Sequence, residues 1–142
     1  MTKAMSRLLA VAALIAFTLA IGPVVAHAQS EGLIAKIPFG FYVGGKELPA
    51  GEYTVQRVEG NMSLVRLADR EGHTLMTFAI PAVREPEHGA KLIFNKYGDE
   101  YFLSEIRWME SSTALEFVPS SRERELAKKT VPQRILAADS RS

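Results

Sequence analysis

The sequence predicts an all-β fold: an antiparallel meander that forms a small sandwich or barrel of about six to eight strands and ends in a short C-terminal α-helix. Short runs rich in β-branched and aromatic residues alternate with turn-forming residues over 33–119, and no stretch keeps a helical period. The chain has 142 residues, enough for one core, and no cysteine, so packing has to supply its stability.

The amino terminus has the three parts of a cleavable signal peptide over residues 1–28. Lys3 and Arg7 precede an apolar run over 8–21, and Ala26-His27-Ala28 supplies a small-x-small cleavage site. The run of about 14 residues is shorter than the roughly 20 that span a bilayer as a helix. We therefore expect an exported protein, periplasmic or extracellular, with no transmembrane segment after cleavage and no cofactor loaded in the cytoplasm.

The antiparallel β domain is expected over residues 29–119. Its first run, 33–43, is closed by Gly44-Gly45, because two glycines allow a turn at positive φ. Within the third run the apolar residues change phase at Leu64 and Val65, so either both faces are covered or a bulge lies there. The remaining strands, each bounded by turn-forming residues, are expected over 52–58, 62–68, 74–80, 92–96, 101–109 and 113–118.

The clearest hairpin joins 92–96 to 101–109 around Gly98-Asp99. These two residues suit a two-residue type II′ turn. A three-residue loop would instead bring favourable cross-strand pairs together, each contributing about 0.2 to 1 kcal/mol. The pairs slightly favour the longer loop, which would join Lys96 with Glu100, Lys91 with Glu105 and Phe94 with Phe102.

A C-terminal helix is predicted over 120–130. Ser120 as N-cap and Glu123 at the third helical position make a capping box. The helix offers little apolar surface, so it is expected to lie on the domain rather than in its core. Residues 131–142 mix small and polar types and are expected to form a flexible tail.

Charge argues against nucleic acid as a partner. Cleavage after residue 28 removes two of the 17 basic residues and none of the 16 acidic ones, which leaves a net charge of −1. Binding to a phosphate backbone depends on clustered Lys and Arg that neutralise its charge. A near-neutral domain lacks that feature.

The sequence predicts no catalytic, cofactor-binding or metal site, and hence no enzyme. His73 and His88 are the only histidines of the mature chain, and neither has a nucleophile motif around it. Glu85 and Glu87 beside His88 are typical of a solvated loop rather than of a metal site. The spacing from Gly40 to Gly45-Lys46 imitates a phosphate-binding loop, but Glu47 stands where a Ser or Thr has to meet magnesium.

Two pairs of neighbouring carboxylates are candidates for an acid and a base. Asp99 with Glu100, and Glu123 with Glu125, resemble the acid and base of a glycoside hydrolase only in being close together. We expect them in a turn and on an exposed helix, where nothing separates their pKa values.

Most aromatic residues lie in the β region and are expected in the core. If the sheet closes into a barrel, Phe78, Phe94 and Trp108 are candidates for lining a cavity for a small apolar ligand. Three other residues are expected to be structural: Gly51 and Gly98 in turns, and Tyr53, which resembles a tyrosine corner whose phenol bonds nearby backbone.

The motif Pro38-Phe39-x-Phe41-x-Val43-Gly44-x-Lys46-x-Leu48-Pro49-Ala50-Gly51-x-Tyr53-x-Val55 resembles a family of small secreted bacterial β proteins with no assigned function. Phe94, the 97–99 and 101–103 segments and residues 121–125 extend the resemblance over about 36–128. These are turn and core signatures, so the resemblance implies a fold and carries no activity.

The best functional hypothesis from the sequence is an exported, non-catalytic β domain with a binding or structural role in the cell envelope. Its partner would be an unidentified envelope protein or a small apolar ligand. The alternative is a carrier that holds such a ligand in a barrel cavity, and a hydrolase is third.

Overall fold

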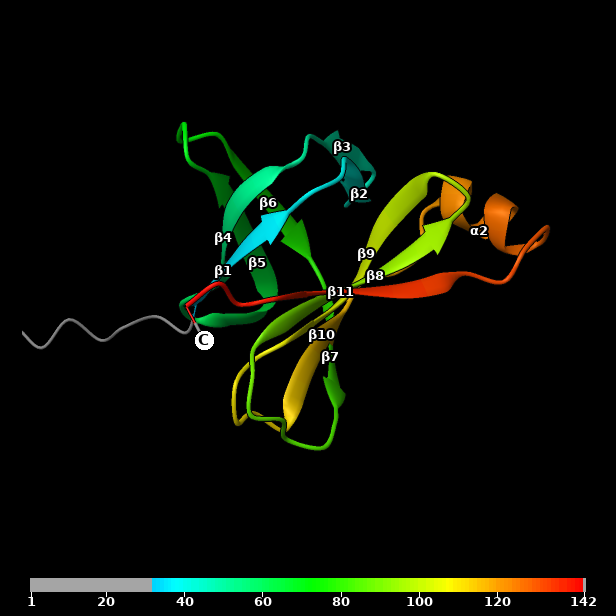
Figure 1. Ribbon diagram of the computed structural model, residues 1–142. Coiled ribbons are helices and arrows are strands. Elements are labelled where there is room, and N and C mark those ends of the chain that lie inside the picture. Colours follow the sequence, from blue (N-terminus) through cyan, green and yellow to red (C-terminus); the bar gives the residue numbers. More distant parts are fainter. Residues whose placement is uncertain (1–31, 142) are drawn as a thin grey trace, which may run out of the picture.

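Two β-sheets and one short helix make up the part of the chain that the structure, a computed structural model, describes: residues 32–141 (Figure 1). The mostly β character expected from the sequence is confirmed, and the sheets do not close into a barrel. The predicted signal peptide, 1–28, lies outside the described residues.

The first sheet is antiparallel and has the order β1-β4-β5-β6. Every second side chain points into the core, as the two-residue period of a strand requires. Leu64 and Val65 point to opposite faces in a regular β5–β6 register, so the phase change seen in the sequence reflects apolar residues on both faces. The β4–β5 register shifts between Arg57 and Val58, a bulge or local irregularity near the same place. The strands are β1 (Gly32–Ile37), β4 (Gly51–Val58), β5 (Asn61–Asp69) and β6 (Thr74–Phe78).

The second sheet is mixed, with the order β11-β8-β9-β10-β7 and the β2–β3 hairpin attached to β9. Tyr42 of β2 pairs in parallel with Phe102 of β9, so the purely antiparallel meander of the prediction is corrected. The strands are β2 (Phe41–Val43), β3 (Lys46–Leu48), β7 (Ile80–Val83), β8 (Lys91–Tyr97), β9 (Glu100–Arg107), β10 (Thr113–Glu116) and β11 (Gln133–Ala138).

Two of the predicted strands each divide between the sheets. The run over 33–43 breaks after Ile37, because Pro38 has no N–H for a ladder, and β2 joins the other sheet. The run over 74–80 breaks at Ala79, whose N–H donates to the Ser63 carbonyl at 2.8 Å, while the next residue already pairs with β10. These divisions, together with β3 and β11 in segments not expected to be strands, raise the strands to eleven within residues 32–141, against the six to eight expected.

The β8–β9 hairpin has the two-residue turn. Tyr97 pairs with Glu100, and Gly98 has φ +60°, which a first turn residue of type II′ requires. The three-residue register that the side-chain pairs favoured is wrong along the whole hairpin: Phe94 pairs with Leu103 rather than Phe102. A register shift between Ile93 and Phe94 then puts Lys91 opposite Arg107 rather than Glu105.

The segment expected to be a flexible tail instead holds β11, which pairs with β8 along all six of its residues. Ile135 and Ala137 alternate toward the core, and this short pattern of small side chains is weak in the sequence. The chain then reaches β1: the Ser140 N–H donates to the Ile34 carbonyl at 2.7 Å. Figure 1 shows the C-terminus beside the start of β1.

The helix α2 (Ser121–Ala127) is shorter than the predicted 120–130, and the Ser120 half of its capping box is confirmed: Ser120 Oγ accepts from the Glu123 N–H at 3.2 Å. Glu123 is nevertheless buried, and its carboxylate accepts from Asn95 Nδ2 at 3.2 Å and Tyr97 Oη at 3.3 Å. The helix therefore rests on the second sheet through a polar contact.

One hydrophobic core draws side chains from both sheets. Phe94 lies at its centre, edge to face with Phe39 and Phe41 at centroid distances of 5.1 and 5.4 Å. Phe41 of β2 also lies edge to face with Tyr53 of β4, at a centroid distance of 5.3 Å, and this contact joins the two sheets.

Candidate functional site

The three aromatics predicted to line a ligand cavity are not brought together. Phe78 is 71% exposed on the outer face of β6, whereas Phe94 and Trp108 are 0% and 3% exposed in the core. Without a closed barrel there is no central cavity for them to line. This candidate site is therefore corrected.

A different pocket, of about 330 Å³, lies between the β2–β3 hairpin and the turn that joins β5 to β6. Both elements lie at the upper side of the view in Figure 1. Its volume falls in the range of small-molecule sites and corresponds to roughly ten non-hydrogen atoms at about 30 Å³ each. Apolar side chains form its walls and polar ones its rim: Leu48, Pro49, Tyr53, Leu67 and Leu75, then Lys46, Asp69, His73 and Thr74.

A second hollow of about 220 Å³ continues this pocket. It shares Pro49, Tyr53 and Asp69 with the first, and the β3–β4 turn and the polar residues Arg70 and Glu71 complete it. Together the two hollows form one groove with an apolar end and a polar end.

Tyr53 holds the groove in shape. Its hydroxyl donates to the Pro49 carbonyl at 2.6 Å, the phenol-to-backbone bond that the sequence predicts. Burial, together with the nearby Asp69 charge, raises the pKa of Tyr53, so the phenol stays protonated and keeps donating. At Gly51 an added Cβ would meet only the Tyr53 ring, at 3.9 Å, so no steric need for glycine is evident there.

Asp69 organises the polar rim. Its Oδ1 accepts from the backbone N–H groups of Glu71 and His73, both at 2.9 Å, and its Oδ2 lies 2.8 Å from His73 Nδ1. Burial opposes ionisation of Asp69, but the hydrogen bonds from His73 and Glu71 outweigh it and lower its pKa. The same side-chain hydrogen bond raises the pKa of His73. The pair is thus close to neutral when His73 is protonated.

Lys46 carries the uncompensated charge of the rim. Within residues 32–141 its ammonium makes no hydrogen bond or ion pair, although the side chain lines the pocket. When His73 is protonated it matches the negative charge of Asp69, and the ammonium of Lys46 then gives the pocket mouth a positive character.

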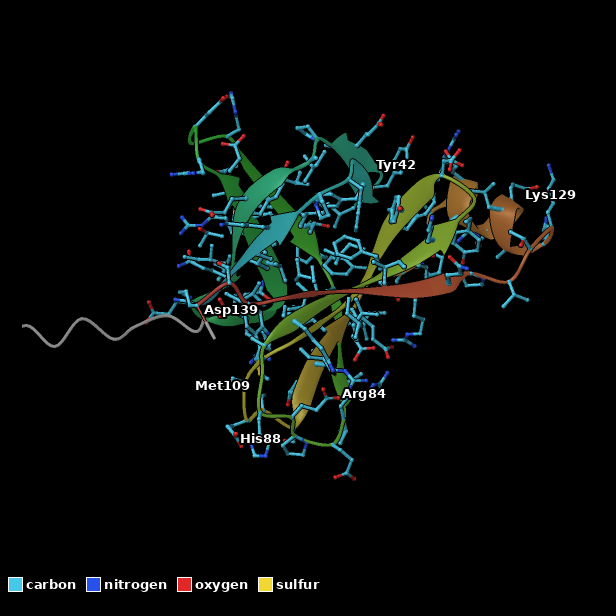
Figure 2. All side chains as sticks on the ribbon, viewed as in Figure 1. Tyr42, Arg84, His88, Met109, Lys129 and Asp139 are labelled. Atoms are coloured by element: carbon cyan, nitrogen blue, oxygen red, sulfur yellow. The ribbon has the colours of Figure 1, made fainter. Side chains whose placement is uncertain are left out.

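The other histidine and its loop do not form a metal site. His88 Nδ1 lies 2.8 Å from Glu110 Oε1 with a fully exposed ring, and Glu87 is held by Lys91 and Arg107. Figure 2 shows His88 at the opposite end of the molecule from Tyr42.

Asp69, Glu71 and His73 do bring their ligand-type atoms within 4.8 Å of one another. They lie at alternate positions of one tight turn, and this spacing was the sequence signal for the cluster that the sequence analysis did not use. The hydrogen bonds described above account for the cluster.

The predicted carboxylate pairs separate as well. Glu100 is bound by Arg122 beside the hairpin turn. Glu125 is exposed, but Glu123 is buried, which corrects the expectation of an exposed pair. The sequence places Glu123 at the third helical position, but that position does not determine whether its side chain is buried.

Within residues 32–141 no helix has the length and apolar character needed to cross a membrane. The family resemblance drawn from the sequence stays a prediction, since no protein-family model, curated protein or solved structure matches the chain.

Proposed function

We propose that the mature chain is an exported, non-catalytic binding protein of the cell envelope, and that its groove holds a small molecule with an apolar body and an anionic head group. The observation that carries the proposal is the pocket of about 330 Å³ with leucine walls and Lys46 at its rim. In this proposal the two sheets form a small sandwich, and a groove at its edge replaces the barrel cavity expected from the sequence.

The apolar walls favour a hydrocarbon body. Leu67 is almost fully buried, while Leu48 and Leu75 are half-buried and present apolar surface to the pocket. Each buried methylene contributes about 0.8 kcal/mol, so about eight of them supply roughly 6 kcal/mol before the cost of association. That figure alone corresponds to a dissociation constant of about 40 µM, and the association cost weakens it, so we expect affinity in the millimolar range.

The rim favours an anionic head. A carboxylate or phosphate would gain a charge-assisted hydrogen bond from Lys46, whose ammonium has no competing partner in the described chain. When His73 is protonated, Asp69 repels such a head only weakly, because the two charges match.

A binding role is also supported by the surroundings of the two histidines. Both are exposed, each is paired with a carboxylate, and neither bonds a hydroxyl within residues 32–141. A nucleophile activated by a base needs such a contact. The hydrolase alternative therefore has no support from the described geometry.

Calorimetric titration with decanoate and with decyltrimethylammonium tests the proposal, since the two probes differ in the sign of the head group. We expect decanoate to bind, the cation to bind at least tenfold more weakly, and Lys46→Gln to weaken decanoate about 10- to 100-fold. Leu75→Trp, which fills the pocket, should abolish binding. Lys129→Gln, at the far end of α2 (Figure 2), is the matched control and should bind like wild type.

Absence of decanoate binding, or equal binding by wild type, Lys46→Gln and Leu75→Trp, would refute the site. Export is tested separately, by amino-terminal sequencing of protein recovered outside the cytoplasm. The chain should begin at Gln29, and retention of Met1 would contradict the signal peptide.

A further inference from the structure

Large apolar side chains are exposed on alternate positions of the edge strand β6 and at the first residue of β7. Met76, Phe78 and Ile80 are 51%, 71% and 55% exposed, and Met62 on the neighbouring β5 is also exposed. Phe78 lies opposite Leu64 of β5, so the stripe continues onto that strand. A contiguous exposed apolar patch on a small protein marks an interaction surface.

One edge of β6 has backbone N–H and C=O groups that no neighbouring strand of the described chain pairs with. β6 is the last strand of the first sheet, and the Ala79 N–H donates to the opposite residue, Ser63. Because the N–H and C=O groups of alternate residues point to opposite edges of a strand, those of Thr74, Met76 and Phe78 point away from β5. They have no partner strand in the sheet order and form a row that another strand can pair with.

The adjoining edge strand, β7, is protected in a way that β6 is not. The Arg84 N–H donates to the opposite Ser112 carbonyl, so by the same alternation Pro81 faces the free edge, where it offers no N–H. β6 has no proline and no charged residue, and no charge occurs anywhere in 74–83. Lysine, proline and bulges are the usual devices that keep edges apart, and β6 carries none of them.

The occupant that fits this edge is a second copy of the same strand. In an antiparallel pairing centred on a two-fold axis, Met76 faces Met76 and Thr74 faces Phe78, and all three open residues form hydrogen-bonded pairs. No charged side chain meets a like charge, because residues 74–83 contain none. The strand that pairs with this edge has to be apolar and free of charge, and β6 of a second copy has both properties.

We infer that two copies associate through their β6 edges into one continuous sheet that crosses the two-fold axis. Burying the exposed stripe and the strand edge covers on the order of 400–500 Å² per copy, the low end for a specific interface, so the dimer is weak, micromolar or weaker. This inference is independent of the ligand groove, whose test uses other residues.

Sedimentation velocity over a concentration series tests the inference. Wild type should shift from monomer to dimer, and Met76→Lys, which places two ammonium groups across the axis, should raise the dissociation constant at least tenfold. Met109→Lys is the matched control: it introduces the same charge at a 62% exposed methionine on another loop, labelled in Figure 2, and should dimerise like wild type. Circular dichroism of each variant verifies the fold.

A cysteine-free chain allows a geometric test as well. Directly opposed residues of a hydrogen-bonded antiparallel pair have Cα atoms about 5.5 Å apart, within disulfide range. Met76→Cys should therefore form a covalent dimer on mild oxidation much faster than Met109→Cys at equal concentration. A wild type that stays monomeric up to about 500 µM, dimers unchanged by Met76→Lys, or equal crosslinking of the two cysteine variants would each overturn the inference.

Discussion

Truncating Phe94 should cost far more stability than truncating Phe78, although the sequence gives both the same appearance of a strand aromatic. Phe94 is fully buried between Phe39 and Phe41, at centroid distances of 5.1 and 5.4 Å. Phe94→Ala removes its transfer free energy and leaves a cavity, which together cost about 3–5 kcal/mol. Phe78 is 71% exposed, so Phe78→Ala should change the free energy of unfolding by no more than about 0.5 kcal/mol.

Urea unfolding followed by circular dichroism measures the difference. With a slope of about 1–1.5 kcal/mol/M for a domain of this size, the midpoint for Phe94→Ala should fall by roughly 2–4 M. Since that loss approaches the total stability of a small domain, Phe94→Leu, at about 1–2 kcal/mol, provides a milder measurement. Work near 1 µM protein keeps the proposed dimer from contributing. Equal losses for the alanine variants of Phe94 and Phe78 would refute the core assignment.

Three further predictions concern other parts of the molecule. Gly44→Ala should lose about 1–3 kcal/mol of stability, because φ is +58° and the new Cβ would lie 2.6 Å from Thr77 Oγ1. Deleting residues 131–142 should lower the melting temperature strongly or prevent folding, since β8 loses the strand that covers its edge. In an NMR titration, His73 should show a pKa above the usual value of about 6.5, and Asp69→Asn should lower it. The raised pKa means that the pair's stabilisation is present below the unfolded-state pKa and is lost as pH rises through the folded-state pKa.

Each of these has a distinguishing outcome. Gly45→Ala has φ +75° but no atom within 4 Å of the new Cβ, so it isolates backbone strain; an equal loss in both variants would show that the clash with Thr77 is absent. A truncated chain that melts at the same temperature as the full chain would show that residues 131–142 form a flexible tail. A His73 pKa unchanged by Asp69→Asn would show that the pair does not form in solution.

Features set by local chemistry were predictable. The glycine turn at Gly98, the capping box from Ser120 to Glu123 and the bond from Tyr53 to Pro49 each involve residues within four positions of one another. Few local conformations compete at such positions, so the sequence pattern is sufficient to predict these features.

Features set by distant partners were not predictable. The parallel contact of Tyr42 with Phe102 joins residues sixty positions apart, and no local pattern selects it. Alternation places Met76 and Phe78 on one side of β6, but periodicity does not determine whether that side faces the core or solvent.

The candidate site escaped prediction for the same reason. Its walls come from β3, β4, β5 and β6, and the motif to which Leu48, Pro49 and Tyr53 belong indicates turns and core rather than a pocket. Leucine and tyrosine at such positions are indistinguishable in sequence from ordinary core. Only the tertiary arrangement leaves a groove there.

The contact between the two ends of the described chain has a kinetic consequence. The Ile34 N–H reaches Asp139 Oδ1, at 3.4 Å, across 105 positions, and β11 covers β8 only when the last residues are available. A ribosome or a translocation channel that still holds the C-terminus therefore delays completion of the fold, and such long-range closure is slow, on the order of milliseconds to seconds. A chain built in this way stays incompletely folded until residues 133–139 have emerged.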